Sequence, residues 1–146
     1  MKLRRTVIGG LALAASLALG ACGGAVPAAT PSAAPNASVL AALPATVSVS
    51  DAAGLRDGGA FVLDVREPDE WAAGHIPDAT LIPLGQLASR VAEVPADRTI
   101  VVVCRSGNRS AQGRDVLFGA GLVAVTSMAG GMNDWTAAGL PVATGS

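Results

Sequence analysis

Aromatic side chains and runs of basic residues are nearly absent from this sequence. Its 146 residues include no tyrosine, two phenylalanines and two tryptophans, and the ten basic residues form no long run. Base stacking and phosphate neutralisation depend on such side chains, so we expect no nucleic-acid partner. Hydrophobic residues make up 51% of the chain and charged residues only 14%, which is enough apolar content to bury the core of one domain.

Cysteine and histidine are equally scarce, with Cys22, Cys104 and His75 as the only examples. Cys22 ends the sequence LGAC, which resembles the cleavage box of bacterial lipoproteins, so we expect it to carry a lipid anchor such as palmitate. Cys104 is then the only thiol left, and no intramolecular disulfide can form. One Cys and one His cannot supply the usual four ligands of a zinc site, so we expect no metal and no other cofactor.

The first 21 residues have the layout of an export signal. Three basic residues precede the apolar run Val7–Leu19, which is shorter than the about 20 apolar residues that span a bilayer. An ordinary signal peptide with a chance cysteine is the alternative to a lipoprotein signal. The pair Arg4-Arg5 leaves open whether export follows the general or the twin-arginine route.

Residues 22–44 follow as a predicted disordered tether of Ala, Pro, Ser and Gly without charge. We therefore expect a domain in residues 45–146, held outside the cytoplasm at the cell membrane or the outer membrane. Seven arginines and eleven acidic residues remain after the signal, a formal net charge of −4. We expect this mature chain to be a monomer.

Strand and helix signals alternate from Thr46 onward, which is typical of an α/β domain with a parallel sheet. Apolar, β-branched stretches predict five strands, at 46–49, 61–65, 80–82, 99–103 and 123–128. Helical patterns lie between and after them, at 50–55 with Ser50 as N-cap, 67–72, 84–94, 110–119 and 133–138. The prediction is a sheet of about five parallel strands flanked by helices on both faces.

The sequence VVVCRSGNRS is where we expect the chemistry. Its buried strand runs directly into Cys104, and ligands bind at the carboxyl ends of strands in open α/β sheets. Gly107 allows the following loop to turn its N–H groups toward the sulfur, and the next helix adds the positive end of its dipole. Both effects favour the nucleophilic thiolate. A small buried hydrophobe is the alternative role for Cys104.

This loop resembles the active-site loop of the rhodanese family of sulfurtransferases, whose single-domain members often carry Cys-Arg-x-Gly-x-Arg-Ser. Two further stretches, LDVREPDEWAAGHIPDATLIP and GGMNDWTAAGLPV, resemble the family's other signatures. The resemblance covers roughly the last hundred residues. It implies a rhodanese-like fold and transfer of sulfane sulfur through a Cys104 persulfide. The implied donor is thiosulfate or a persulfide, and the implied acceptor is a thiol, cyanide or a partner protein.

The resemblance also places the other candidate site residues. The active-site loop comprises Arg105, Ser106, Gly107, Asn108, Arg109 and Ser110. We expect Arg105 to contact substrate and Arg109 to pair with a carboxylate, Glu70 being the candidate. Asp64 and Arg66 are expected to support the loop, an ion pair elsewhere being the alternative. His75, between Gly74 and Ile76, is predicted to be a turn residue hydrogen-bonded to backbone rather than a catalytic one.

Three positions depart from the family pattern. Glu70 and Ser106 stand where two-domain thiosulfate enzymes carry Arg and Lys, which should weaken dianion binding and leave persulfides or polysulfides as donors. Asp78 stands where the family usually has Gly, and we expect that change to affect only a turn.

Two other functions remain open: a sulfur carrier or partner-binding module with slow turnover, and a cysteine phosphatase or arsenate reductase. The second is disfavoured because four residues separate Cys104 from Arg109, where those phosphatases have five.

Overall fold

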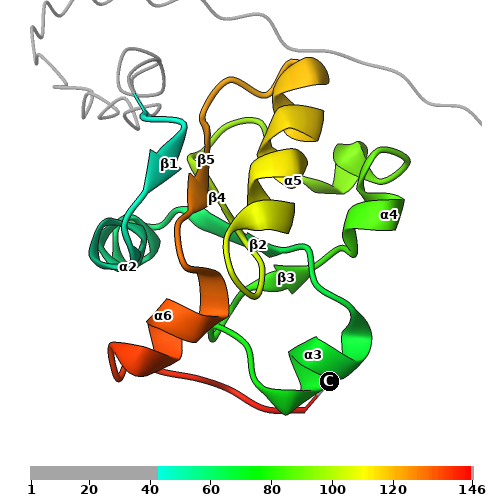
Figure 1. The fold of residues 1–146 in the computed structure, drawn as a ribbon. Coiled ribbons are helices and arrows are strands. Elements are labelled where there is room, and N and C mark those ends of the chain that lie inside the picture. Colours follow the sequence, from blue (N-terminus) through cyan, green and yellow to red (C-terminus); the bar gives the residue numbers. More distant parts are fainter. Residues whose placement is uncertain (1–42, 146) are drawn as a thin grey trace, which may run out of the picture. The chain divides into compact units, whose positions relative to one another are not determined.

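A computed structural model describes residues 43–145. The expected signal peptide, the lipid site Cys22 and nearly all of the expected tether therefore lie outside the described residues. Within them, five parallel strands form one sheet in the order β1-β5-β4-β2-β3 (Figure 1). The strands are β1 Thr46–Val47, β2 Phe61–Asp64, β3 Thr80–Leu81, β4 Ile100–Val103 and β5 Val125–Met128. The parallel five-stranded sheet predicted from the sequence is confirmed.

Strand β4 lies at the centre of the sheet because its sequence IVVV suits burial on both faces. All four of its residues are buried, and it pairs in register with β2 on one side and β5 on the other. Successive side chains point to opposite faces. Ile100, Val102 and Cys104 accordingly join one core cluster, and Val101 and Val103 the other. This alternation carries the Cys104 side chain to the same face of the sheet as the helix that follows it.

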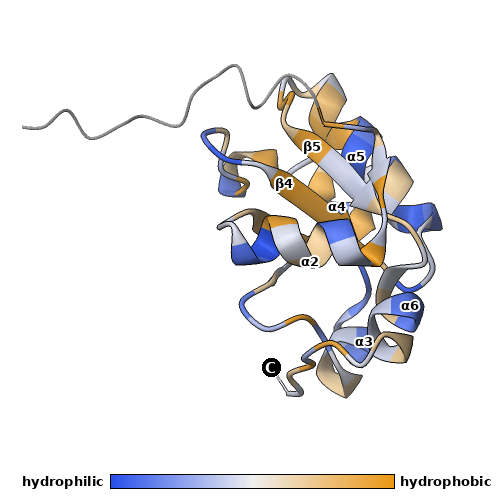
Figure 2. Ribbon diagram, turned by 90° about the vertical axis from the view of Figure 1, so that its left-hand side faces the viewer, coloured by the Kyte–Doolittle hydropathy of each residue, from blue (hydrophilic) through white to orange (hydrophobic). Residues whose placement is uncertain are grey.

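Helices cover both faces of the sheet, as predicted (Figure 1). They are α2 Val49–Asp57, α3 Pro68–Ala73, α4 Leu84–Leu87, the 3-10 turn Val91–Glu93, α5 Asn108–Gly119 and α6 Gly131–Ala137. Leu87 of α4 and Leu117 of α5 pack in the core on one face, and Ala52 of α2 and Trp135 of α6 in the core on the other. Figure 2 shows β4 in the orange of hydrophobic residues, while α2 carries hydrophilic blue segments.

The long helix predicted for residues 84–94 is wrong. Helix α4 ends at Leu87, and a separate 3-10 turn begins at Val91. The Ser89 hydroxyl donates to the Gln86 carbonyl at 2.9 Å, a local bond that competes with continued helix formation. Leu84 and Val91 still pack against the core, so the prediction of which residues face inward is confirmed. The prediction of a continuous helix between them is not.

Several boundaries also differ from the sequence prediction. Strand β1 ends at Val47 because Ser48 is the N-cap of α2: its hydroxyl oxygen accepts the Asp51 N–H at 3.2 Å, and Ser50 is already helical. Helix α5 begins at Asn108, two residues before the predicted start, and α6 begins at Gly131. No helix in residues 43–145 is long and apolar enough to cross a membrane.

Candidate active site around Cys104

Cys104 follows the last residue of β4 and is nearly inaccessible, with 1% of its surface exposed. The turn of residues 105–107 then leads into α5. Two backbone bonds fix this turn to the start of α6: the Met132 N–H donates to the Cys104 carbonyl at 2.8 Å, and the Asn133 N–H to the Arg105 carbonyl at 3.0 Å. The nucleophile is therefore held between the central strand and two helices.

The turn directs hydrogen-bond donors at the sulfur, as the sequence predicted. The Gly107 N–H lies 3.1 Å from Cys104 Sγ. Gly107 has φ 101°, in the left-handed region that glycine adopts without strain. Ser110 Oγ lies 3.7 Å from the same sulfur and 2.8 Å from the Gly107 carbonyl, so one hydroxyl contacts both the nucleophile and the turn.

These contacts change the acidity of the thiol. Burial by itself raises the pKa of Cys104, because the charged form loses hydration. Hydrogen bonds from the backbone of Ser110, Ser106 and Gly107 and from the Ser110 hydroxyl oppose it, and the net pKa lies below the ordinary value of 9.0. The site therefore favours the thiolate without a side-chain base beside it.

Gly131 allows α6 to approach the nucleophile this closely. Its φ is 58°, and a Cβ atom at this position would lie 2.3 Å from the Cys104 carbonyl oxygen and 2.6 Å from the Arg105 carbonyl carbon. Any larger residue would collide with the backbone of the turn. Neither Gly131 nor the two N–H groups that follow it was assigned a role from the sequence, although the pair Gly130-Gly131 is the kind of signal that marks a close backbone approach.

Arg109 pairs with Glu70, the partner expected for it. Its two terminal nitrogens each donate to a different carboxylate oxygen, both at 2.7 Å. The Glu70 carboxylate also accepts the Glu67 N–H at 3.2 Å. The Arg109 hydrogen bond is the main cause that lowers the pKa of Glu70 from 4.5 to about 2, against an opposing effect of burial. Arg109 thus ties the start of α5 to α3.

Asp64 and Arg66 form a buried ion pair, with Arg66 Nη2 2.6 Å from Asp64 Oδ2. The remaining Arg66 donors reach the Glu70 carbonyl at 3.1 Å and the Gly74 carbonyl at 2.8 Å. The pair therefore supports α3, and reaches the active-site loop only through Glu70 and Arg109. Of the two roles considered for these residues, the structure shows the mutual ion pair, with an indirect contribution to the loop.

His75 is hydrogen-bonded to backbone, as predicted, but it forms an antiparallel bridge with Ala143 and does not lie in the turn, which is at Pro77 and Asp78. Its ring stacks on Trp71 with centroids 3.6 Å apart, and Nδ1 lies 3.1 Å from the Trp71 carbonyl. Its backbone N–H and carbonyl both bond to Ala143 at 2.8 Å. His75 therefore anchors the C-terminal segment of residues 140–145 along α3, and it takes no part in the contacts of Cys104.

Two of the hollows on the domain lie at opposite ends of strands β2 and β4. One, of about 310 Å³, lies beside the active-site loop between α3, α6 and the C-terminal segment; we call it the side pocket. Its lining includes Arg105 and Asn133 at the loop, Ala73 and Gly74 at the end of α3, and Met132 and Val142. Arg105 therefore faces a cavity next to the nucleophile, where a substrate contact was expected.

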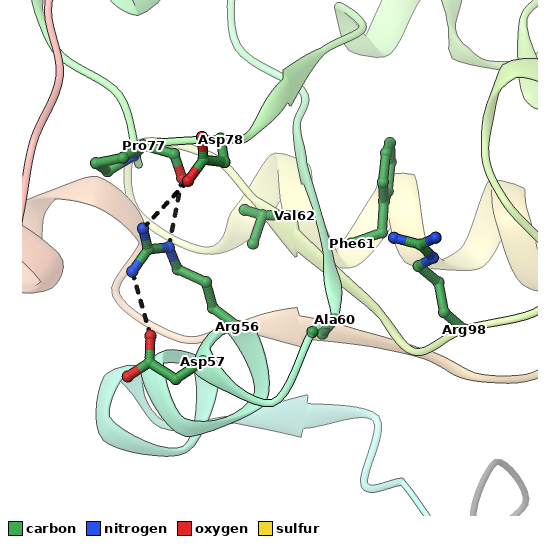
Figure 3. Close-up of a pocket in the computed structure, with 9 residues that line it drawn as sticks. Arg56, Asp57, Ala60, Phe61, Val62, Pro77, Asp78 and Arg98 are labelled. Carbon is green, nitrogen blue, oxygen red and sulfur yellow. Dashed lines mark hydrogen bonds and ion pairs between the residues drawn. The ribbon is translucent and has the colours of Figure 1, made fainter. Parts of the chain in front are cut away.

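The second hollow, of about 340 Å³, lies at the amino-terminal edge of β2 and β4 and holds no nucleophile (Figure 3). Arg56 on its wall is engaged by Asp57 at 3.2 Å, by Asp78 at 3.8 Å and by the Pro77 carbonyl at 3.3 Å. Asp78 has φ 65°, a turn conformation that favours glycine. Asp78 was expected to affect only this turn, but its carboxylate also lies 3.8 Å from the Arg56 guanidinium of α2.

The residues that the structure describes include no group of His, Cys, Asp and Glu arranged to hold a metal ion. The chemistry available at this site is that of an acidified thiol with N–H donors around it. Such a group attacks electrophilic sulfur, and the same donors can stabilise the anion that results.

Comparisons with known proteins agree with this geometry. A family model described as "Rhodanese-like domain" matches residues 48–138. The chain is 41% identical over 82 residues to a sulfurtransferase of Allochromatium vinosum, covering 56% of this chain and 77% of that one. It is 37% identical over 84 residues to the thiosulfate sulfurtransferase GlpE of Pseudomonas syringae, covering 58% and 79%. The human single-domain sulfurtransferase TSTD1 has a similar structure, with a TM-score of 0.59, 29% identity and coverage of 64% and 96%.

Proposed function

Because the chain belongs to the family of rhodanese-like domains, we propose that it is a sulfurtransferase that carries sulfane sulfur as a persulfide on Cys104. The observation that carries this proposal is the Gly107 N–H at 3.1 Å from the Cys104 sulfur, at the carboxyl end of the central strand. The relatives named as sulfurtransferases support it.

The first half-reaction loads the enzyme. The Cys104 thiolate attacks the outer sulfur of a persulfide RS–SH or of thiosulfate, and a new S–S bond forms at Sγ. The S–S bond of the donor breaks, and the donor leaves as the thiolate RS⁻ or as sulfite. The N–H groups of the turn stabilise the negative charge of the attacking thiolate and of the persulfide that replaces it.

The second half-reaction returns the enzyme to its starting state. A thiolate or cyanide attacks the outer sulfur of the Cys104 persulfide, and Cys104 leaves as the thiolate. The lowered pKa of Cys104 makes it a better leaving group than an ordinary cysteine thiolate. Because the sulfur is almost wholly buried, only a small or extended acceptor reaches it through the mouth of the loop.

The position of Arg109 argues against phosphatase chemistry. An arginine that clamps a phosphate or arsenate presents its two terminal nitrogens to the oxyanion. Here both of these nitrogens donate to Glu70, which holds the guanidinium against α3.

Mass spectrometry of the purified domain after incubation with thiosulfate and with glutathione persulfide tests the proposal. We expect a gain of one sulfur atom on Cys104, lost again on addition of cyanide, and no gain in Cys104→Ser. Cys104→Ser should keep the melting temperature of the wild type, because the change is nearly isosteric. Loading that persists in Cys104→Ser would refute the mechanism, and loading without repeated turnover would identify a sulfur carrier instead of an enzyme.

We propose in addition that a lipid on Cys22 tethers the domain to the outside of the cytoplasmic membrane or to the outer membrane. The support is the sequence of residues 1–22, in which a basic segment, an apolar run and LGAC follow one another. Cys22→Ala should block lipid attachment and signal removal while the sulfur chemistry of the domain persists. A normally cleaved and membrane-bound form of that variant would show that Cys22 is not the anchor.

A further inference from the structure

The end of the sheet opposite Cys104 carries an exposed apolar turn. Residues 118–123, which read FGAGLV, contain no polar side chain and connect the end of α5 to β5; we call them the apolar turn. Phe118 is 53% exposed and Val123 is 62% exposed, and they are two of the three large hydrophobic side chains that are exposed within residues 43–145. Single exposed hydrophobic residues are common on proteins, so the position of this pair in the molecule decides what it means.

The apolar turn is held in one conformation. The Gly121 N–H donates to the Phe118 carbonyl at 3.0 Å, and the Leu122 N–H donates to the Leu117 carbonyl at 3.1 Å. Leu122 packs against the core, while Phe118 and Val123 on either side of it are exposed. The two exposed side chains could therefore contact a surface without the cost of ordering a loop.

The chain enters the domain at this same end of the sheet. Thr126 Oγ1 donates to the Pro44 carbonyl at 2.7 Å, and the Ser127 N–H donates to the Ala45 carbonyl at 3.0 Å. Because β1 and β5 are parallel, Pro44 lies at the end where β5 begins, just after Val123. In Figure 1 the end of α5 and the start of β1 both lie at the upper end of the sheet, whereas α3 and α6 lie at the lower end.

This entry point limits how far the apolar turn can move from the proposed lipid anchor. A flexible tether between Cys22 and Pro44 would have an average length of roughly 25 Å. A lipid on Cys22 would thus keep the turn within reach of the bilayer at a high effective concentration. Under that condition a small apolar contact is enough to hold the domain on the surface, whereas a partner protein would have to arrive by diffusion.

Charge does not provide the contact. The Arg114 guanidinium carbon lies 5.8 Å from the centre of the Phe118 ring, but this arginine also pairs with Asp115 at 2.5 Å. Arg98, near the start of β4, lies 3.8 Å from Asp97. Both cations at this end of the sheet therefore have an acidic neighbour, and contact with a bilayer would depend on apolar side chains more than on anionic lipid.

From these features we propose that the apolar turn docks on the lipid bilayer, with Phe118 and Val123 inserted at the level of the headgroups. The inference rests on the proposed lipid tether and adds the orientation of the domain. Strand β4 runs from this end of the sheet to Cys104, a span of roughly 13 Å at about 3.3 Å for each residue. The active-site loop then faces away from the membrane, toward the aqueous compartment from which donors and acceptors arrive.

The test measures the depth of a fluorescent label on the full, lipid-bearing chain in vesicles of phosphatidylethanolamine and phosphatidylglycerol. In a Cys104→Ser background, Ala120→Cys places one free thiol in the apolar turn, and Ala73→Cys places one at the end of α3; both alanines are exposed. With the same nitrobenzoxadiazole label, a nitroxide lipid should quench the Ala120 position about fivefold more strongly than the Ala73 position. Iodide in the water should show the reverse order, and added salt should change neither result.

A second measurement removes the apolar contact. Phe118→Asp combined with Val123→Asp should lower the lipid quenching at Ala120 to the level at Ala73, because a carboxylate does not enter the bilayer. Val123→Asp alone should give a partial loss, and it serves if the double variant does not fold. Val142→Asp is the matched control: Val142 is also exposed, but it lies at the Cys104 end and should leave the quenching unchanged. With Cys104 intact, the double variant should load sulfur at the wild-type rate.

The outcomes separate the orientation from the tether. Mass spectrometry reports the lipid on Cys22: a chain without lipid would refute the proposed tether and this inference with it. A lipid-bearing chain whose two labels are quenched equally would refute the orientation and leave the tether standing. Protection of the Ala120 label from iodide without lipid quenching would show that a second copy or another protein surface covers the turn, and would also overturn the proposal.

Discussion

Arg109 and Glu70 meet in a two-pronged ion pair, with both guanidinium nitrogens 2.7 Å from separate carboxylate oxygens. The two residues are 39 positions apart in the chain, and their pairing joins the first turn of α5 to α3. Since Arg66 holds the carbonyls at Glu70 and Gly74, the active-site loop is braced by two ion pairs in series. Arg109 is therefore committed to structure, whereas Arg105 lines the side pocket and forms no ion pair within residues 43–145.

Glu70→Gln should destabilise the domain by about 1 kcal/mol near neutral pH, a value reduced for solvent screening because both partners are partly exposed. The folded-state pKa of Glu70 is about 2, below its ordinary 4.5. The stabilisation is therefore complete above pH 4.5 and is lost as the pH falls toward 2. Thermal unfolding of both proteins should show a gap in Tm at pH 7 that narrows by pH 3.

The matched control for that experiment is Glu93→Gln. It removes the pair between Arg90 and Glu93, which is equally short at 2.7 Å but more exposed, and should leave Tm unchanged. Equal Tm values for wild type and Glu70→Gln at pH 7 would show that the ion pair between Arg109 and Glu70 does not contribute to stability.

The acidity of Cys104 can be followed by the rate of alkylation against pH. We expect a midpoint below the ordinary 9.0 in the wild type. Ser110→Ala should raise it, because the Ser110 side chain is one of the groups that lower the pKa of Cys104. Ser106→Ala keeps the backbone N–H that acts on the sulfur and should leave the midpoint in place. A wild-type midpoint at or above 9.0 would mean that sulfur transfer needs a separate base.

Gly131→Ala should displace the active-site turn. The added Cβ would lie 2.3 Å from the Cys104 carbonyl oxygen, and its φ of 58° is strained for alanine. We expect a loss of at least about 2 kcal/mol of stability and a larger proportional loss of sulfur loading. Gly54→Ala, in the middle of α2 with no atom within 4 Å of the new methyl group, should leave both unchanged or add slight stability. Normal loading in Gly131→Ala would show that the turn adapts.

Ser106→Lys should raise kcat/KM for thiosulfate. Ser106 is exposed in the active-site turn, and one added charge-assisted hydrogen bond contributes about 1.5 to 3 kcal/mol, or roughly ten- to a hundredfold. Two-domain thiosulfate enzymes also carry an arginine at the position of Glu70. Glu70→Arg would remove the ion pair with Arg109, and we expect this loss to cancel the gain in kcat/KM. Gln112→Lys, exposed on α5, adds the same charge elsewhere as a control. An equal effect of both lysines would indicate a general charge effect.

The parallel sheet and the nucleophile Cys104 could be predicted from local sequence patterns. The run Ile100–Val103 is β-branched without alternation, which predicts a strand buried on both faces with Cys104 at its carboxyl end, and the structure has this strand. Gly107 predicted the turn whose N–H donates to Cys104 Sγ. Glu70 was named as the partner of Arg109 from the family resemblance and the need of a loop arginine for a carboxylate.

Contacts between distant segments decided the rest. The apolar spacing of residues 84–94 suits one helix, yet α4 ends at Leu87 and a separate 3-10 turn follows, with a local bond from the Ser89 hydroxyl to the Gln86 carbonyl between them. The role of Gly131 becomes visible only when α6 lies against the active-site turn. Periodicity and motif spacing describe a residue's neighbours along the chain, whereas the walls of the side pocket come from residues 66 to 142, which only the packed sheet brings together.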